Sequence, residues 1–125
     1  MFSLGIRREF VAQHYLVGGN WGAENAPHSH DYRLEAVMQG KSLNRHGFLI
    51  DIVEAEHELD ELLAQFRGVT LNTLPDFEGL NPSVERFARI LCASLANRIR
   101  SESLTALTIK LWESPTAWAS YRLEF

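Results

Sequence analysis

Three histidines are spaced so that their imidazole rings can meet. His28 and His30 lie two residues apart in a segment with the alternation of a β-strand, so their side chains point to the same face. His14 ends the preceding alternating segment, on its apolar side. If the two segments pair as a hairpin, the three rings converge at one end of a sheet. Imidazole carries protons or binds metals near neutral pH, although a single histidine on a strand is more commonly a structural residue.

Glu113 is a second residue whose position calls for a partner. It falls on the apolar face of a later strand, just after Leu111. An inward carboxylate is costly unless it is paired or binds a ligand. The sequence leaves two alternatives open for Glu113, an ion pair with a basic residue such as Arg122 or a role in binding.

Periodicity predicts two strands, two helices and two strands. Alternation predicts strands over residues 4–16 and from residue 28 to a turn at 44–47, joined by a loop over 18–27 that is rich in Gly, Asn and Pro. A helical period follows over 51–66, where Asp51 can cap the helix and one stripe is apolar. Its members are Ile52, Ala55, Leu59, Leu62 and Phe66.

A second helix is predicted from Asn81 as its N-cap and Pro82 as its first residue, and it runs to about Ile99. Alternation then predicts strands over 107–111 and 119–123. This order of elements is typical of an α+β domain, an antiparallel sheet with both helices on one face.

Length and composition exclude several classes of protein. The chain has 125 residues, of which 46% are hydrophobic and 22% charged, which predicts one globular domain over residues 1–125. We expect neither a membrane span nor a signal peptide, because no long apolar run or basic-then-apolar start is present. A net charge of −4 argues against a nucleic-acid partner. The single cysteine, Cys92, excludes a disulfide framework and a cysteine-based zinc cluster.

Motifs along nearly the whole chain resemble the 6-pyruvoyl tetrahydropterin synthase family, which includes 6-carboxytetrahydropterin synthase of the queuosine pathway. The matching segments are Phe10-Val-Ala-Gln-His14, His28-Ser-His30 with Tyr32, Gly47, Asp51, Leu71-Asn72, Asn81-Pro82-Ser83-x-Glu85, and Lys110-Leu-Trp-Glu113-Ser-Pro-Thr-x-Trp118-x-x-Tyr121. The resemblance implies a tunnelling fold of ββααββ subunits in a cytoplasmic homohexamer, a dimer of trimers. In that family, the three subunits of each trimer together form a closed barrel.

The resemblance also implies the site. Zinc is expected on His14, His28 and His30, between subunits, with an open position for the hydroxyls of a pterin side chain. Glu113 matches the family's pterin anchor, which accepts hydrogen bonds from the ring N–H and the exocyclic amine of a 2-amino-4-oxo pyrimidine. Ser83 matches a threonine beside the same ring.

The chain departs from the family's pattern at three places. Glu24 stands where the family carries a catalytic cysteine, four residues before the first histidine of the pair. A branch with glutamate there releases 6-hydroxymethyl-dihydropterin from dihydroneopterin triphosphate. Arg67 and Gly68 stand where an Asp-His pair relays protons, and neither can do that work. Ser29 replaces the usual glycine between the two histidines.

These features predict a zinc-dependent, lyase-like homologue that acts on a reduced pterin such as dihydroneopterin or its triphosphate, with Glu24 in proton transfer. The alternatives are a pterin-binding homologue without activity and a structural hexamer without metal. A further hypothesis turns Arg67 toward the pocket, to hold a phosphate or carboxylate.

Overall fold

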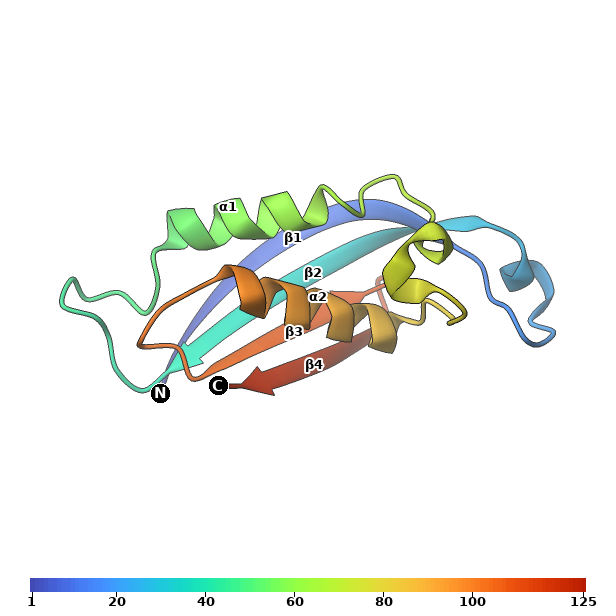
Figure 1. Cartoon of the computed structure of the whole chain (residues 1–125). Coiled ribbons are helices and arrows are strands. Elements are labelled where there is room, and N and C mark those ends of the chain that lie inside the picture. The colour runs from blue at the N-terminus through green and yellow to red at the C-terminus, as the bar shows by residue number, and fades with distance from the viewer.

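A four-stranded antiparallel sheet forms the base of the molecule, and two helices lie across one of its faces (Figure 1). The computed structural model describes residues 1–125. The strands are β1 (Phe2–His14), β2 (His28–Gly40), β3 (Ala106–Trp112) and β4 (Trp118–Glu124), in that order across the sheet. Helices α1 (Ile52–Leu63) and α2 (Val84–Arg98) connect β2 to β3. The predicted α+β class and element order are confirmed.

The register of the sheet determines which side chains are neighbours. The hairpin of β1 and β2 pairs His14 with His28 and Phe10 with Tyr32. Strand β3 joins β2 with Arg33 opposite Trp112. Since side chains alternate between faces, all residues that share the face of His14 point toward the helices.

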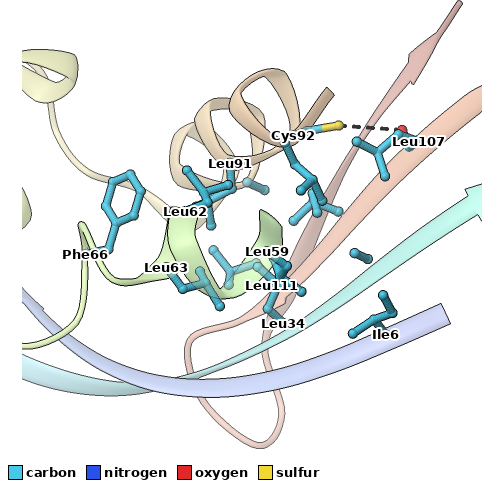
Figure 2. Packing of buried hydrophobic residues seen from close by; sticks show 14 of the residues in the cluster. Ile6, Leu34, Leu59, Leu62, Leu63, Phe66, Leu91, Cys92, Leu107 and Leu111 are labelled. Carbon is cyan, nitrogen blue, oxygen red and sulfur yellow. Dashed lines mark hydrogen bonds between the residues drawn. The ribbon is translucent and has the colours of Figure 1, made fainter. Parts of the chain in front are cut away.

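The core lies between the sheet and the two helices (Figure 2). The sheet contributes apolar side chains such as Ile6, Leu34 and Leu111, all of them buried. The helices contribute their apolar stripes, which include Leu59, Leu62 and Leu63 of α1 and Leu91 and Cys92 of α2. The Cys92 thiol contacts the carbonyl oxygen of Leu107 at 3.5 Å, and Cys92 is a small buried residue, as predicted.

Helix α1 is shorter than the predicted 51–66. Asp51 caps it as predicted, with Oδ1 accepting from the backbone N–H of Val53 at 2.9 Å. Ile52 then lies in the first turn, on the solvent side, and is 47% exposed rather than buried. After Leu63 the chain tightens into turns, and the N–H of Phe66 bonds to the Leu63 carbonyl. Phe66 still reaches the core from outside the helix.

The predicted start of the second helix is wrong by two residues. Ser83, not Asn81, is the N-cap, and its Oγ accepts the backbone N–H of Arg86 at 3.2 Å. The Asn81 side chain is used elsewhere, because its amide accepts from the N–H of Val17 and donates to the Val17 carbonyl. Pro82 therefore precedes the cap, and its carbonyl is free to bond outside the helix.

Strand β1 ends at His14, two residues before the predicted end. Beyond it, side-chain amides replace strand pairing: Asn72 bonds both backbone groups of Tyr15, at 3.0 and 2.9 Å. Asn81 does the same for Val17. These two asparagines thus fix the chain where it leaves the sheet, directly after His14.

No helix here has the length and apolar character that crossing a membrane requires.

An ion-pair cluster ties α1 to β1. The Arg8 guanidinium lies 2.7 Å from Asp60 and 2.6 Å from Glu56, both on α1. The hydrogen bond from Arg8 lowers the pKa of Asp60 below its usual value of 3.8. A carboxyl group whose pKa is lowered in the folded state stabilises that state at pH values above its ordinary pKa. This stabilisation is lost as the pH falls through the lowered pKa.

We predict that Arg8→Met lowers the free energy of unfolding by about 1 kcal/mol at neutral pH, since these pairs are partly exposed. The difference from wild type should vanish in strong acid, where Asp60 is protonated. Urea unfolding at neutral pH and in strong acid measures this difference in the free energy of unfolding. Arg7→Met is the matched control, because the Arg7–Glu35 pair is exposed on the other face, with Arg7 79% exposed. Equal losses in the two variants would contradict the role of the cluster.

Candidate functional site

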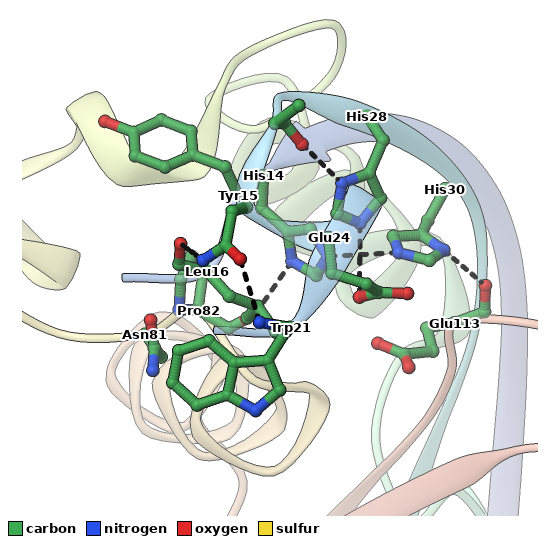
Figure 3. A network of polar contacts seen from close by, with 12 residues as sticks. His14, Tyr15, Leu16, Trp21, Glu24, His28, His30, Asn81, Pro82 and Glu113 are labelled. Carbon is green, nitrogen blue, oxygen red and sulfur yellow. Dashed lines mark hydrogen bonds and ion pairs between the residues drawn. The ribbon is translucent and has the colours of Figure 1, made fainter. Parts of the chain in front are cut away.

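The structure brings together the three histidines that the sequence singled out. His14 and His28 are direct partners across the hairpin, and His30 is the next inward residue of β2. Their ring centroids lie 4.6 to 4.9 Å apart, and one ring nitrogen from each lies within 4.8 Å of the others. Figure 3 shows the rings facing one another at the end of the sheet.

Each ring is oriented by a backbone carbonyl. The contacts are His14 Nδ1 to the Pro82 oxygen at 3.0 Å, His28 Nδ1 to the Ala26 oxygen at 2.8 Å, and His30 Nδ1 to the Glu113 oxygen at 3.1 Å. A carbonyl oxygen can only accept, so each Nδ1 must carry the proton. In a neutral ring, Nε2 is then left with a bare lone pair.

No hydrogen-bond donor outside the three rings reaches these bare nitrogens. His14 Nε2 and His30 Nε2 are 3.0 Å apart, and His28 Nε2 is buried with no hydrogen-bond partner. Two lone pairs at that distance repel unless a proton or a cation lies between them. Burial lowers the pKa of His14, which disfavours the proton. The donor set therefore fits a divalent metal, and Nδ1–H groups held by backbone carbonyls are the usual support of metal-binding histidines.

Glu24 lies beside the three rings. It belongs to a short 3-10 helix, Gly22–Asn25, in the loop between β1 and β2. Its Oε2 is 3.6 Å from His28 Nε2, and its side chain is 55% exposed. The loop is tied back to β1, because the Leu16 N–H bonds to the Glu24 carbonyl at 2.9 Å and the Asn25 amide donates to the Leu16 carbonyl. Figure 3 shows the Glu24 carboxylate beside the rings, and its exposure leaves it open to solvent.

Glu113 follows β3 directly, and its main chain and side chain have separate roles. Its carbonyl orients His30, as described above, and its N–H bonds to the Ala117 carbonyl. The carboxylate has no ion-pair partner. Arg122, the alternative partner that the sequence offered, contacts Glu124 and the Gln39 side chain instead. The side chain is therefore available to a ligand.

A hollow of about 620 Å³ lies beside this end of the sheet. Glu113, Tyr32, Trp112 and Arg67 are among the residues that line it. Arg67 lines this hollow and forms no ion pair, and its role toward a charged ligand stays a hypothesis. Its Nη1 donates to the carbonyl of Glu9 at 2.9 Å, so one side of the guanidinium is already used by the edge of β1.

Gly68 continues the same edge contact. Its N–H donates to the Val11 carbonyl at 2.7 Å, and the next residue accepts from the Gln13 N–H at 3.0 Å. Gly68 adopts a φ of +69°, which favours glycine at this turn. The segment after α1 therefore covers part of the β1 edge, and neither Arg67 nor Gly68 offers a group that can accept a proton.

Ser83 lies next to Pro82, whose carbonyl holds His14. The Ser83 hydroxyl oxygen accepts the helix-capping bond from the Arg86 N–H, which leaves the hydroxyl proton free to donate.

The three carbonyls that orient the histidines could not be predicted from the sequence. Every residue carries a carbonyl, and only the folded path of the chain selects those of Ala26, Pro82 and Glu113.

The 6-pyruvoyl tetrahydropterin synthase family model matches residues 3–124. The chain belongs to this family. The family is one of lyases, and the fold described above is its tunnelling fold. No curated protein sequence gives a significant match.

Solved structures agree on the fold. The 6-pyruvoyl tetrahydropterin synthase of Caenorhabditis elegans superposes with a TM-score of 0.83 at 18% identity, covering 98% of this chain and 96% of that one. A 6-pyruvoyltetrahydropterin synthase of Plasmodium vivax, in which a catalytic glutamate is replaced by alanine, superposes with a TM-score of 0.82 at 13% identity. The match covers 99% of this chain and 98% of that one. A dihydroneopterin aldolase from Burkholderia thailandensis, bound to guanine, superposes with a TM-score of 0.51 at 8% identity. The match covers 98% of this chain and 88% of that one.

The geometry predicts that zinc stabilises the folded chain. At a free zinc concentration about 1,000 times the dissociation constant, the free energy of unfolding should rise by about 4 kcal/mol. His28→Ala, which removes one of the three nitrogens, should abolish most of this gain. Denaturant melts with zinc and with a chelator measure both.

The matched control is His57→Ala, because His57 is 67% exposed on α1 and remote from the three rings. It should respond to zinc as the wild type does. Equal stabilisation of the His28→Ala variant would contradict the metal site.

Proposed function

We propose that the protein is a zinc-dependent lyase of a reduced pterin, such as dihydroneopterin or its triphosphate, with Glu24 as the proton-transfer group. The observation that carries this proposal is the cluster of three imidazoles, each with Nδ1 bonded to a carbonyl and Nε2 bare, beside a carboxylate. Membership in a lyase family supports the reaction class.

Zinc held by the Nε2 atoms of His14, His28 and His30 would acidify hydroxyl groups of the substrate side chain. Glu24 then has the position of a general base, because its carboxylate faces the same space as His28 Nε2. Its partial exposure lets it exchange the proton with solvent. This set of groups would support a proton abstraction or a retro-aldol cleavage of the side chain. In the cleavage, the hydroxyl on the second side-chain carbon would lose its proton and the bond between the first and second carbons would break. The outer two carbons would leave as an aldehyde, and the first carbon would take up a proton. A catalytic glutamate in the Plasmodium vivax synthase supports such a role on this fold.

Glu113 is proposed to anchor the pterin ring. Its carboxylate has no partner in the chain, so it is free to accept from the ring N–H and the exocyclic amine of a 2-amino-4-oxo pyrimidine. Hydrogen bonds to a charged group contribute about 1.5–3 kcal/mol each. The free hydroxyl proton of Ser83 supplies a weaker second contact. Guanine, which the aldolase of the same fold binds, carries the same 2-amino-4-oxo edge.

We also propose that the single domain, residues 1–125, works in the cytoplasm as a homohexamer of two trimers, with the site between subunits. Strands β1 and β4 are the edges of the sheet. Only the part of β1 near residues 9–13 is covered by the segment after α1. Apart from the Arg7 carbonyl, which accepts from the Arg8 side chain, the remaining edge groups are proposed to pair with neighbouring subunits.

The second candidate function is pterin binding without turnover. It is favoured by the use of Arg67 and Gly68 as edge contacts of β1, where they offer no proton relay. It predicts that pterins bind, that Glu113→Ala weakens them, and that no product forms. A structural hexamer without metal predicts no bound zinc at all.

The deciding experiment is incubation of the zinc-loaded wild type and Glu24→Gln with dihydroneopterin and its triphosphate, followed by product identification. We expect the wild type to release 6-hydroxymethyl-dihydropterin. Glu24→Gln should lose at least about 100-fold in rate, the usual contribution of a general base, with ligand affinity unchanged.

Glu78→Gln is the matched control, since Glu78 is an exposed carboxylate outside the site. It should react at the wild-type rate. Full activity of Glu24→Gln would refute the role of Glu24, and absence of product from a wild type that binds pterin would favour the binding protein.

A further inference from the structure

Tyr32 carries a buried hydroxyl that packing does not explain. The residue is 1% exposed, and its ring stacks on Phe10 at 5.3 Å and meets Phe87 edge-on at 5.2 Å. The hydroxyl oxygen has no hydrogen-bond partner. A buried hydroxyl without a partner destabilises the fold, and phenylalanine would avoid that loss. Phe10, its partner on β1, shows that this row of the sheet accepts a ring without a hydroxyl.

The position of Tyr32 connects it to Glu113. Because Arg33 is opposite Trp112, the preceding residue of β2 is opposite the residue that follows Trp112, so Tyr32 and Glu113 are neighbours on the inward face. Both also line the hollow beside the sheet. A phenolic hydroxyl carries its proton at neutral pH, so the Tyr32 hydroxyl can donate a hydrogen bond.

Two other donors next to the Glu113 side chain are already engaged. His30 uses its Nδ1–H on the Glu113 carbonyl, and the Glu113 N–H bonds to Ala117. The Tyr32 hydroxyl, in contrast, has no partner in the chain and is free to donate to a ligand.

We propose that Tyr32 is a specificity-determining residue, whose hydroxyl donates to the oxygen at position 4 of the ring that Glu113 binds. The inference rests on the proposed role of Glu113 as ring anchor. Two carboxylate oxygens followed by one O–H form the pattern acceptor, acceptor, donor. The edge of a 2-amino-4-oxo pyrimidine presents the complement: an amino group, a ring N–H and a carbonyl oxygen. A ring with an amino group at position 4 has no oxygen there and no N–H at position 3, so it complements neither the Tyr32 donor nor the second carboxylate oxygen of Glu113.

The test compares pterin with 2,4-diaminopteridine by equilibrium binding to the zinc-loaded protein. Tyr32→Phe should weaken pterin about 5- to 10-fold, the usual effect of one lost hydrogen bond, and leave 2,4-diaminopteridine unchanged or tighter. Tyr121→Phe is the matched control, since Tyr121 is a partly buried tyrosine on β4, and should change neither affinity. The melting curve of Tyr32→Phe should show a fold at least as stable as wild type.

A double-mutant cycle separates direct contact from an effect through Glu113. If the hydroxyl contacts the ring, Tyr32→Phe weakens pterin by a similar factor in a Glu113→Gln background. Loss of the effect in that background would show that Tyr32 only positions Glu113, and this would overturn the proposal. An equal change for both rings, or no change, would assign Tyr32 to packing alone. A wild type that binds neither ring would instead refute the proposed function, and the inference with it.

Discussion

Three backbone carbonyls give the site its chemistry. Each accepts the Nδ1–H of one histidine, which fixes the tautomer and turns Nε2 toward the other two rings. The carbonyls come from three separate parts of the chain: the loop before β2, the residue before the α2 cap, and the end of β3. The site is therefore complete only when the sheet, the loop and α2 are all in place.

The same constraint links the metal end of the site to the ring-binding end. The Glu113 carbonyl orients His30, while the Glu113 carboxylate is the proposed ring anchor. Any shift at the end of β3 would thus move both. On the other side, Asn81 fixes the chain after β1 to the start of α2, which keeps His14 near the Pro82 carbonyl. Glu24, the proposed proton-transfer group, lies in a loop that is tied to Leu16 just beyond His14.

Periodicity and residue type predicted the order of the elements, the inward face of the sheet and the convergence of the histidines. These depend on local spacing and on strand alternation, which the sequence displays directly. The start of α2 was mispredicted because both Asn81 and Ser83 can cap a helix, and only the tertiary contact of Asn81 with Val17 decides between them. Ile52 fits the apolar stripe of α1 but lies at its first turn, where the sheet no longer covers it. The carbonyl partners and the unpaired Tyr32 hydroxyl have no sequence signal, because they are set by chain paths that meet only in the fold.

The central claim is that His14, His28 and His30 together bind zinc through Nε2. X-ray absorption spectroscopy at the zinc edge of the loaded protein tests it most directly. We expect three imidazole nitrogens at about 2.0–2.1 Å and no sulfur ligand, with one imidazole fewer in His30→Ala. A zinc ion without this imidazole signature, or one whose signature is unchanged in His30→Ala, would contradict it.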